Sequence, residues 1–189
     1  MQAAASPSIA QIDDGSPFLL AVLANPPLGA ESRTLGRVRL AARILGFEQM
    51  RIANLFAIAS ASSRDIAVLG HDVHGWEIAR PPLLEAIVAA EQVLIGFGTI
   101  PVTGAARRNF EEQLRWLAEV LHLQGHDMVW QVGQARHPSR WHQYVSDRHG
   151  RTSGGSFDER LREVLVSTET AALSWGLHRP PARSVDRRG

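Results

Sequence analysis

Short apolar runs alternate along this chain with longer segments in which apolar residues recur at helical spacing. The runs are five to nine residues long and several are bounded by proline or glycine, as in Pro17 before the first and Pro26-Pro27 after it. Runs of this length with such boundaries are typical of strands buried on both faces. We therefore predict strands over Phe18–Ala24, Met50–Ile58, Gln92–Phe97 and Met128–Val132.

The segments between and after these runs have the pattern of amphipathic helices. In the longest, Leu114, Leu117, Val120 and Leu121 recur on one side. The helices are predicted over Arg33–Leu45, Pro82–Ala90, Gly104–Leu123 and Phe157–Leu173. Strands that alternate with helices favour parallel pairing with right-handed crossovers. The predicted fold is α/β, a four-stranded parallel sheet between helices (an α/β/α sandwich).

The length and composition place most of the chain in one domain. The 189 residues are 44 % hydrophobic and 21 % charged, which is ordinary for one globular domain. We predict that domain over residues 17–176, after an Ala/Ser/Pro-rich flexible segment at 1–16 and before a basic flexible tail at 177–189. No apolar run approaches the ~20 residues of a membrane span, and the start lacks a signal-peptide pattern. We expect a cytoplasmic monomer with no membrane contact.

Two residue types are absent, and each absence excludes classes of chemistry. The chain has no cysteine, and all 20 Lys+Arg residues are arginine. Thiol nucleophiles, Cys-ligated zinc and iron–sulfur clusters are therefore excluded, as are Schiff-base and P-loop lysines. No cofactor is expected.

Ligands of parallel sheets bind beyond the carboxyl ends of the strands, so the loops there are the candidate sites. After the first strand, Asn25 is followed by two prolines that restrict the loop, and Glu31 lies a few residues on. An asparagine amide can orient a water, and a carboxylate can accept the proton of that water. The alternative is an asparagine that stabilises a turn beside an exposed glutamate.

The loop after the fourth strand is basic. It holds Arg136, His137, Ser139, Arg140 and Trp141. An imidazole and a hydroxyl at a strand end, next to cations and a large ring, suit phosphates and unstacked bases. The alternative is a loop with a capping histidine and a solvated basic face.

Two further positions carry candidate chemistry. Asn54 lies near the end of the second predicted strand, and an asparagine side chain can pair with the donor and acceptor edge of a base. It can equally satisfy a nearby backbone group. A rival cluster at His71, Asp72, His74 and Glu77 has donors for a divalent metal, but no matching second set of ligands. The alternative for that cluster is an exposed polar loop with no metal.

Several of these landmarks occur in the order of a known pattern. Over residues ~18–150 the chain resembles bacterial domain-of-unknown-function family 1643, whose pattern runs Asn-Pro-Ser, Ala-Asp with a Thr, Val-Asn-Leu-Phe, Trp-Gly and Arg-His-Pro. The matching positions are Asn25–Pro27, Ala30–Thr34, Ala53–Phe56, Phe97–Gly98 and Arg136–Pro138.

The same landmarks resemble the uracil-DNA glycosylase superfamily. The resemblance implies that Asn25 positions the hydrolytic water, that Asn54 reads the base, and that His137 stabilises the departing base. It also implies that Arg140 and Trp141 fill the gap in the duplex. In the same loop, Arg136 is expected to bind DNA and Ser139 to bind the base. Phe56 is the candidate aromatic above the base. Pro27 replaces a family glycine and no Gly-Gln-Asp-Pro-Tyr occurs, so ordinary uracil excision is not implied.

The function predicted from these residues is a monofunctional DNA glycosylase. It would hydrolyse the N-glycosidic bond of a modified or damaged base and leave an abasic site, with DNA as its partner. Defence against phages with modified DNA is the biological hypothesis. The alternatives are a non-catalytic binder of modified nucleobases or nucleic acid on the same fold, and a metal-dependent hydrolase that uses the His71–Glu77 cluster.

Overall fold

The computed structural model describes residues 16–27, 33–60, 65–98, 102–145 and 155–172. It is an α/β fold built on one mixed sheet in the order β2-β1-β3-β4-β5. The strands span β1 Phe18–Leu23, β2 Gln49–Asn54, β3 Gln92–Ile95, β4 Met128–Val132 and β5 Leu165–Glu169. The first four pair in parallel, and β5 pairs antiparallel with β4.

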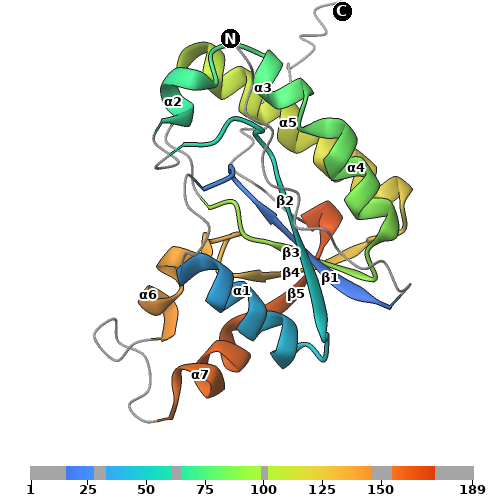
Figure 1. Cartoon of the computed structure of the whole chain (residues 1–189), viewed down its shortest axis with the longest axis vertical. Helices are drawn as coiled ribbons and strands as arrows, with labels where there is room; N and C mark the ends of the chain where they lie inside the picture. The colour runs from blue at the N-terminus through green and yellow to red at the C-terminus, as the bar shows by residue number, and fades with distance from the viewer. Residues whose placement is uncertain (1–15, 28–32, 61–64, 99–101, 146–154, 173–189) are drawn as a thin grey trace, which may run out of the picture.

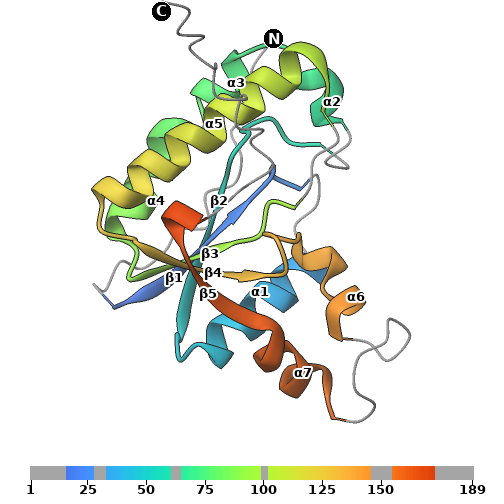
Figure 2. The same cartoon turned by 180° about the vertical axis from the view of Figure 1, so that it is seen from behind.

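Helices cover both faces of this sheet (Figure 1, Figure 2). One face carries α4 (Arg80–Ala89) and α5 (Gly104–Leu123), with the short α2 (Ile66–Leu69) and α3 (His74–Glu77) beyond them. The other face carries α1 (Arg33–Ile44), α6 (His142–Val145) and α7 (Phe157–Val164). Two 3₁₀ turns, η1 (Pro138–Arg140) and η3 (Thr170–Ala172), complete the described elements. None of the described helices is both long and apolar enough to cross a membrane.

Two hydrophobic cores follow from the alternation of side chains along the strands. All six residues of β1 are buried, because the central strands are covered on both faces. Leu20 and Val22 point into the core under α4 and α5, whereas Leu19 and Ala21 point into the core under α1 and α7. The sheet therefore fixes where each helix packs.

The last predicted helix, over Phe157–Leu173, is wrong after its second turn. A Ser156 capping box starts α7, and the chain then becomes extended at Leu165 and forms β5. Val166 and Thr168 are β-branched and favour strands. The free edge of β4 supplies the partner, with Val132 opposite Leu165 and Met128 opposite Glu169. A pairing with a strand more than thirty residues away cannot be found in the local pattern.

The other boundaries shift by a few residues. The second strand ends at Asn54 rather than Ile58, and the third at Ile95 rather than Phe97. The parallel four-stranded core is confirmed, and the sheet formed by the described residues has five strands. The predicted flexible ends at 1–16 and 177–189 lie outside the described residues, apart from residue 16.

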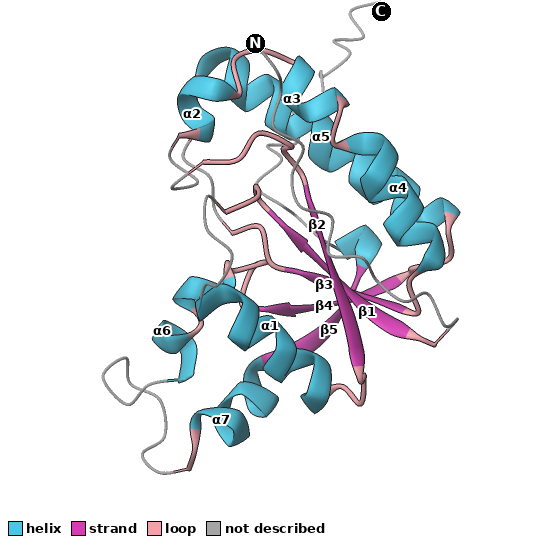
Figure 3. Cartoon of the chain, viewed as in Figure 1, coloured by secondary structure: helices cyan, strands magenta, loops and turns pink. Residues whose placement is uncertain are grey.

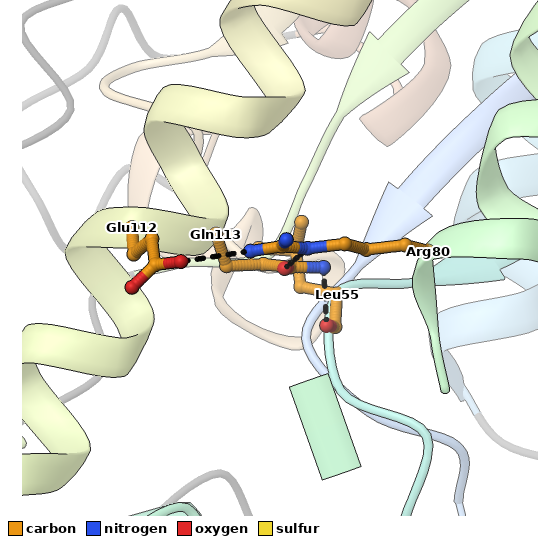
Figure 4. A network of polar contacts seen from close by, with 4 residues as sticks. All are labelled: Leu55, Arg80, Glu112 and Gln113. Carbon is orange, nitrogen blue, oxygen red and sulfur yellow. Dashed lines mark hydrogen bonds and ion pairs between the residues drawn. The ribbon is translucent and has the colours of Figure 1, made fainter. Parts of the chain in front are cut away.

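A buried polar clasp holds the end of β2 to the helices above it (Figure 4). The fully buried Gln113 of α5 donates from Nε2 to the Leu55 carbonyl oxygen at 3.1 Å. Its Oε1 accepts from Arg80 Nε at 2.9 Å. Arg80 also lies 3.5 Å from Glu112, which is largely exposed, and over the ring of Trp116. One glutamine thus joins α4, α5 and the residue that follows Asn54.

The clasp predicts unequal effects of two neighbouring substitutions. Gln113→Leu leaves the Leu55 carbonyl without its donor and Arg80 without its acceptor, so it should lower the free energy of unfolding by roughly 2 kcal/mol. Glu112→Gln removes only an exposed ion pair and should change it by less than about 1 kcal/mol. Urea unfolding of both variants measures the difference. Equal losses would show that the glutamine is not the main connection.

Candidate functional site

In sheets with this strand order, the ligand crevice commonly lies between the ends of the two strands whose connections diverge, here β1 and β3. From β1 the chain passes to β2 on one side, and β3 lies on the other, so the connections diverge at this point. Sheets of this kind bind ligands in that crevice, beyond the carboxyl ends of the strands. Asn25 follows β1, Asn54 ends β2, Gly98 follows β3 and His137 follows β4. Figure 3 shows these strands in magenta between the cyan helices. The predicted residues thus lie along one edge of the sheet.

Close backbone contact fixes the loop that carries His137. Gly98 N–H donates to the Ala135 carbonyl oxygen at 2.7 Å. Gly98 has φ +76°, and a Cβ added to it would lie 2.9 Å from the Cβ of His137. A Cβ on Gly96 would lie 3.3 Å from the Pro138 ring. The end of β3 therefore needs glycine to let the loop approach.

A buried glutamine supports the same loop from below. Gln131 of β4 accepts from Ala135 N–H at 2.8 Å through Oε1 and donates to Thr168 Oγ1 of β5 at 2.9 Å. Ala135 has φ +51°, a left-handed conformation that non-glycine residues adopt at some energetic cost. The hydrogen bonds to both sides of Ala135 hold it there. The unpredicted strand β5 thus helps to position His137.

The hydrogen bonds of His137 fix its tautomer. Its Nδ1 accepts from the backbone N–H of Ser139 at 3.3 Å and lies 2.8 Å from Ser139 Oγ. Because Nδ1 is an acceptor, the proton of the neutral ring resides on Nε2. Burial, and then the nearby charges of Arg140 and Arg37, lower the pKa of His137 below its ordinary value. The ring is therefore a neutral Nε2–H donor at neutral pH.

Asn25 is also held in one orientation. Its Nδ2 donates to Ser60 Oγ at 2.9 Å, to the Ser60 carbonyl at 3.3 Å and to the Pro26 carbonyl at 3.1 Å. With the NH₂ group tied to the segment after β2, Oδ1 is left as an acceptor that has no hydrogen bond from the described residues. Such an oxygen can receive a hydrogen bond from a water.

Asn54 carries an unsatisfied buried acceptor. Its Oδ1 is shielded from solvent and has no hydrogen-bonding partner among the described residues. A buried acceptor without a partner costs about 1–3 kcal/mol, and such exceptions in folded proteins require an explanation. A donor on a bound molecule would satisfy this oxygen.

Beside the loop of His137, residues of α1, η1 and α6 line an open cleft of about 420 Å³. None of its described lining residues is negatively charged. The lining consists of Arg33, Thr34, Arg37, Ser139, Arg140 and His142. The sequence analysis found Ser139 and Arg140 but missed Arg33 and Arg37. Their four-residue spacing at the start of a helix that follows β1 was the available signal.

Two aromatic residues differ from their predicted roles. Trp141 is fully buried and donates from Nε1 to the Arg136 carbonyl at 2.8 Å. Phe56 is fully buried with its ring centroid 4.7 Å from that of Trp76. These rings pack the two cores, which corrects the expectation that they offer exposed surfaces to DNA or a base.

The other predicted residues have mixed outcomes. Arg136 is half-buried, with its guanidinium 5.8 Å from the centroid of the Tyr144 ring. Glu31 lies outside the described residues. The rival cluster at His71–Glu77 is not assembled as a metal site, and Asp72 Oδ1 instead accepts from His74 N–H at 2.9 Å. Nowhere in the described part of the chain do three or more histidine or acidic side chains form a group that could hold a metal.

The comparisons with known proteins add no assignment. The chain matches no family model. No curated protein and no solved structure is significantly similar to it. The resemblance noted from the sequence therefore stays a prediction.

The contact at Gly98 predicts a position-specific cost. Gly98→Ala should lower the free energy of unfolding by about 1–3 kcal/mol more than Gly125→Ala, because the new Cβ meets His137. Gly125 is a matched control with φ +78° and nothing within 4 Å of an added Cβ. Denaturant unfolding measures both variants, and imidazole NMR shifts of His137 should move only in Gly98→Ala. Equal losses would show that the close approach is not required.

The lowered pKa of His137 predicts a pH dependence of stability. The unfolded chain takes up the proton first on acidification, so the folded state loses stability as the pH falls through about 6.5, and the loss ends below the lowered pKa. His137→Asn removes this titration. As the pH falls through that interval, the unfolding free energy of wild type should therefore decrease relative to that of His137→Asn. A pH-independent difference would mean that His137 titrates alike in both states.

Proposed function

We propose that the protein is a monofunctional DNA glycosylase that hydrolyses the bond between C1′ and a modified or damaged base. The observation that carries the proposal is the neutral His137, whose Nε2–H is a fixed donor at the strand end where ligands of this sheet bind. Two features on the same edge support it: the fixed Asn25, whose Oδ1 accepts no hydrogen bond from the described residues, and the basic cleft.

The proposed reaction begins with a nucleotide flipped out of the strand, because the bond cannot be reached inside a duplex. The C1′–N bond breaks through an oxocarbenium-like state, and its electron pair stays with the base. A water oriented by Asn25 Oδ1 then bonds to C1′ and gives up a proton. Glu31 is the carboxylate predicted to take that proton, which finally reaches the released base.

His137 acts in this scheme on the departing base. A neutral imidazole donates from Nε2–H to the base as negative charge develops on it. One preorganised donor of this kind is worth about 2.7–4 kcal/mol in the transition state. Tautomer and orientation are set in advance by Ser139, so no reorganisation is needed when the bond breaks.

Asn54 is the proposed base-reading residue. Its buried Oδ1 accepts no hydrogen bond from the described residues, and an exocyclic or ring N–H of a base would supply one. A base whose edge presents only acceptors to this oxygen would leave it unsatisfied and bind more weakly. This preference selects among modified bases without any metal or cofactor.

The deciding experiment uses the full chain and genomic DNA from phages that carry different modified bases. Wild type should release a free base, detected by mass spectrometry, and leave abasic sites. Asn25→Ala should abolish release, and His137→Ala should slow it roughly 10²–10³-fold, the usual loss of one such donor. His122→Ala is the matched control, because His122 is exposed on α5 and pairs only with Asp127 of the loop that follows α5 among the described residues. It should behave as wild type.

The absence of lysine predicts that base release leaves the DNA strand intact. Strand cleavage by a bifunctional glycosylase proceeds through a Schiff base, for which this chain has no side-chain amine. Labelled DNA should break only after alkali, and borohydride should trap no adduct. Breaks without alkali together with a trapped adduct would contradict the proposal. Binding of modified DNA without abasic sites would replace it with a non-catalytic binder on the same fold.

A further inference from the structure

The basic cleft beside His137 has the composition of an anion site. Three arginines line it, Arg33 and Arg37 of α1 and Arg140 of η1. Thr34 also lines the cleft and brings a hydroxyl donor, whereas the Ser139 hydroxyl lies 2.8 Å from the acceptor Nδ1 of His137. Arg33 and Arg37 are four residues apart on the helix, a spacing at which like charges destabilise it. None of the three arginines forms an ion pair with a described residue.

Arg37 is held rigidly in the cleft. Its Nη1 donates to the Pro138 carbonyl at 2.6 Å, and its guanidinium lies 5.6 Å from the centroid of the Phe157 ring. A guanidinium has five N–H donors, and its other donors have no acceptor among the described residues. Burial and the charge of Arg33 lower the pKa of Arg37, because both disfavour the cation. A bound anion would relieve both effects.

The chemistry of the cleft favours a phosphate. Arginine presents its donors in a planar fork that matches phosphate oxygens, and hydroxyls complete such sites. Ser139 connects the cleft to the strand-end site, since its Oγ lies 2.8 Å from Nδ1 of His137 while the residue lines the cleft. A phosphate in the cleft is therefore next to whatever His137 contacts.

We propose that this cleft binds one phosphodiester group of a nucleic-acid strand and thereby holds the strand while the neighbouring nucleotide lies at His137. The inference rests on the proposed function for the identity of the strand. It assigns to Arg33, Thr34 and Arg37 of α1 a contact that the loop after β4 cannot make alone.

The test is binding of a fluorescent single-stranded oligonucleotide, measured by anisotropy over a range of salt concentrations. Arg33→Gln and Arg140→Gln should each weaken binding several-fold and reduce the slope of log K against log salt by up to about 0.7, the contribution of one phosphate in a single strand. Arg39→Gln is the matched control, since Arg39 is an exposed arginine on α1 outside the cleft. It should match wild type in both quantities. Equal behaviour of all three variants would overturn the proposal.

A second arm tests which phosphate is bound. An oligonucleotide series with one uncharged methylphosphonate linkage, moved along the strand, should contain one position that weakens wild type but has little further effect on Arg33→Gln. No such position would overturn the assignment of a single phosphate. If a nucleoside monophosphate bound as tightly as the oligonucleotide, with the same sensitivity to Arg33→Gln, the cleft would hold a free nucleotide and not a strand.

These outcomes are separable from those of the proposed function. The oligonucleotides carry only ordinary bases, so binding to the cleft is measured without base release. A charge-dependent cleft without base release would keep this inference and reject the glycosylase. Base release that is unaffected by Arg33→Gln and Arg140→Gln would do the reverse.

Discussion

The close contact between the turn after β3 and the loop after β4 is the constraint on which the site depends. The Gly98–Ala135 hydrogen bond and the lack of room for a Cβ at Gly98 bring the two backbones together. That approach carries Pro138 to α1, where its carbonyl oxygen meets Arg37. One contact between two strand ends therefore fixes the backbone at His137 and brings the loop after β4 against α1, whose residues line the basic cleft.

The arginines of the cleft act in two ways. As donors they can bind an anion, and as charges they keep His137 neutral, together with the larger effect of burial. An anion in the cleft would weaken the second effect, because it offsets the positive field of Arg37 and Arg140. Burial would still disfavour the imidazolium. The ring therefore stays a neutral donor in both the empty and the occupied cleft, which suits a group that must donate without protonating its partner beforehand.

Much of the fold could be predicted from the sequence because its strands are continuous apolar runs with local boundaries. β5 could not, since Leu165–Glu169 becomes a strand only through the free edge of β4. The positions of Asn25, Asn54 and His137 at the carboxyl edge could be predicted, because each polar residue ends or follows an apolar run in the sequence. Trp141 was misjudged because its ring turns into the core, and Arg37 was missed because its partner, the Pro138 carbonyl, lies 101 residues away.

Three locally unfavourable features meet at the carboxyl edge of the sheet. Ala135 has a left-handed backbone conformation. Asn54 Oδ1 is buried and accepts no hydrogen bond from the described residues, and the charges of Arg33 and Arg37 repel each other on α1. Each lowers stability, and each would be relieved or used by a ligand: the turn presents His137, the amide oxygen needs a donor, and the cations need an anion. Proteins retain such departures where function requires them. All three lie at one edge of the sheet, whereas the two cores on its faces are packed conventionally. This coincidence is the strongest physical reason to propose that the function resides at that edge.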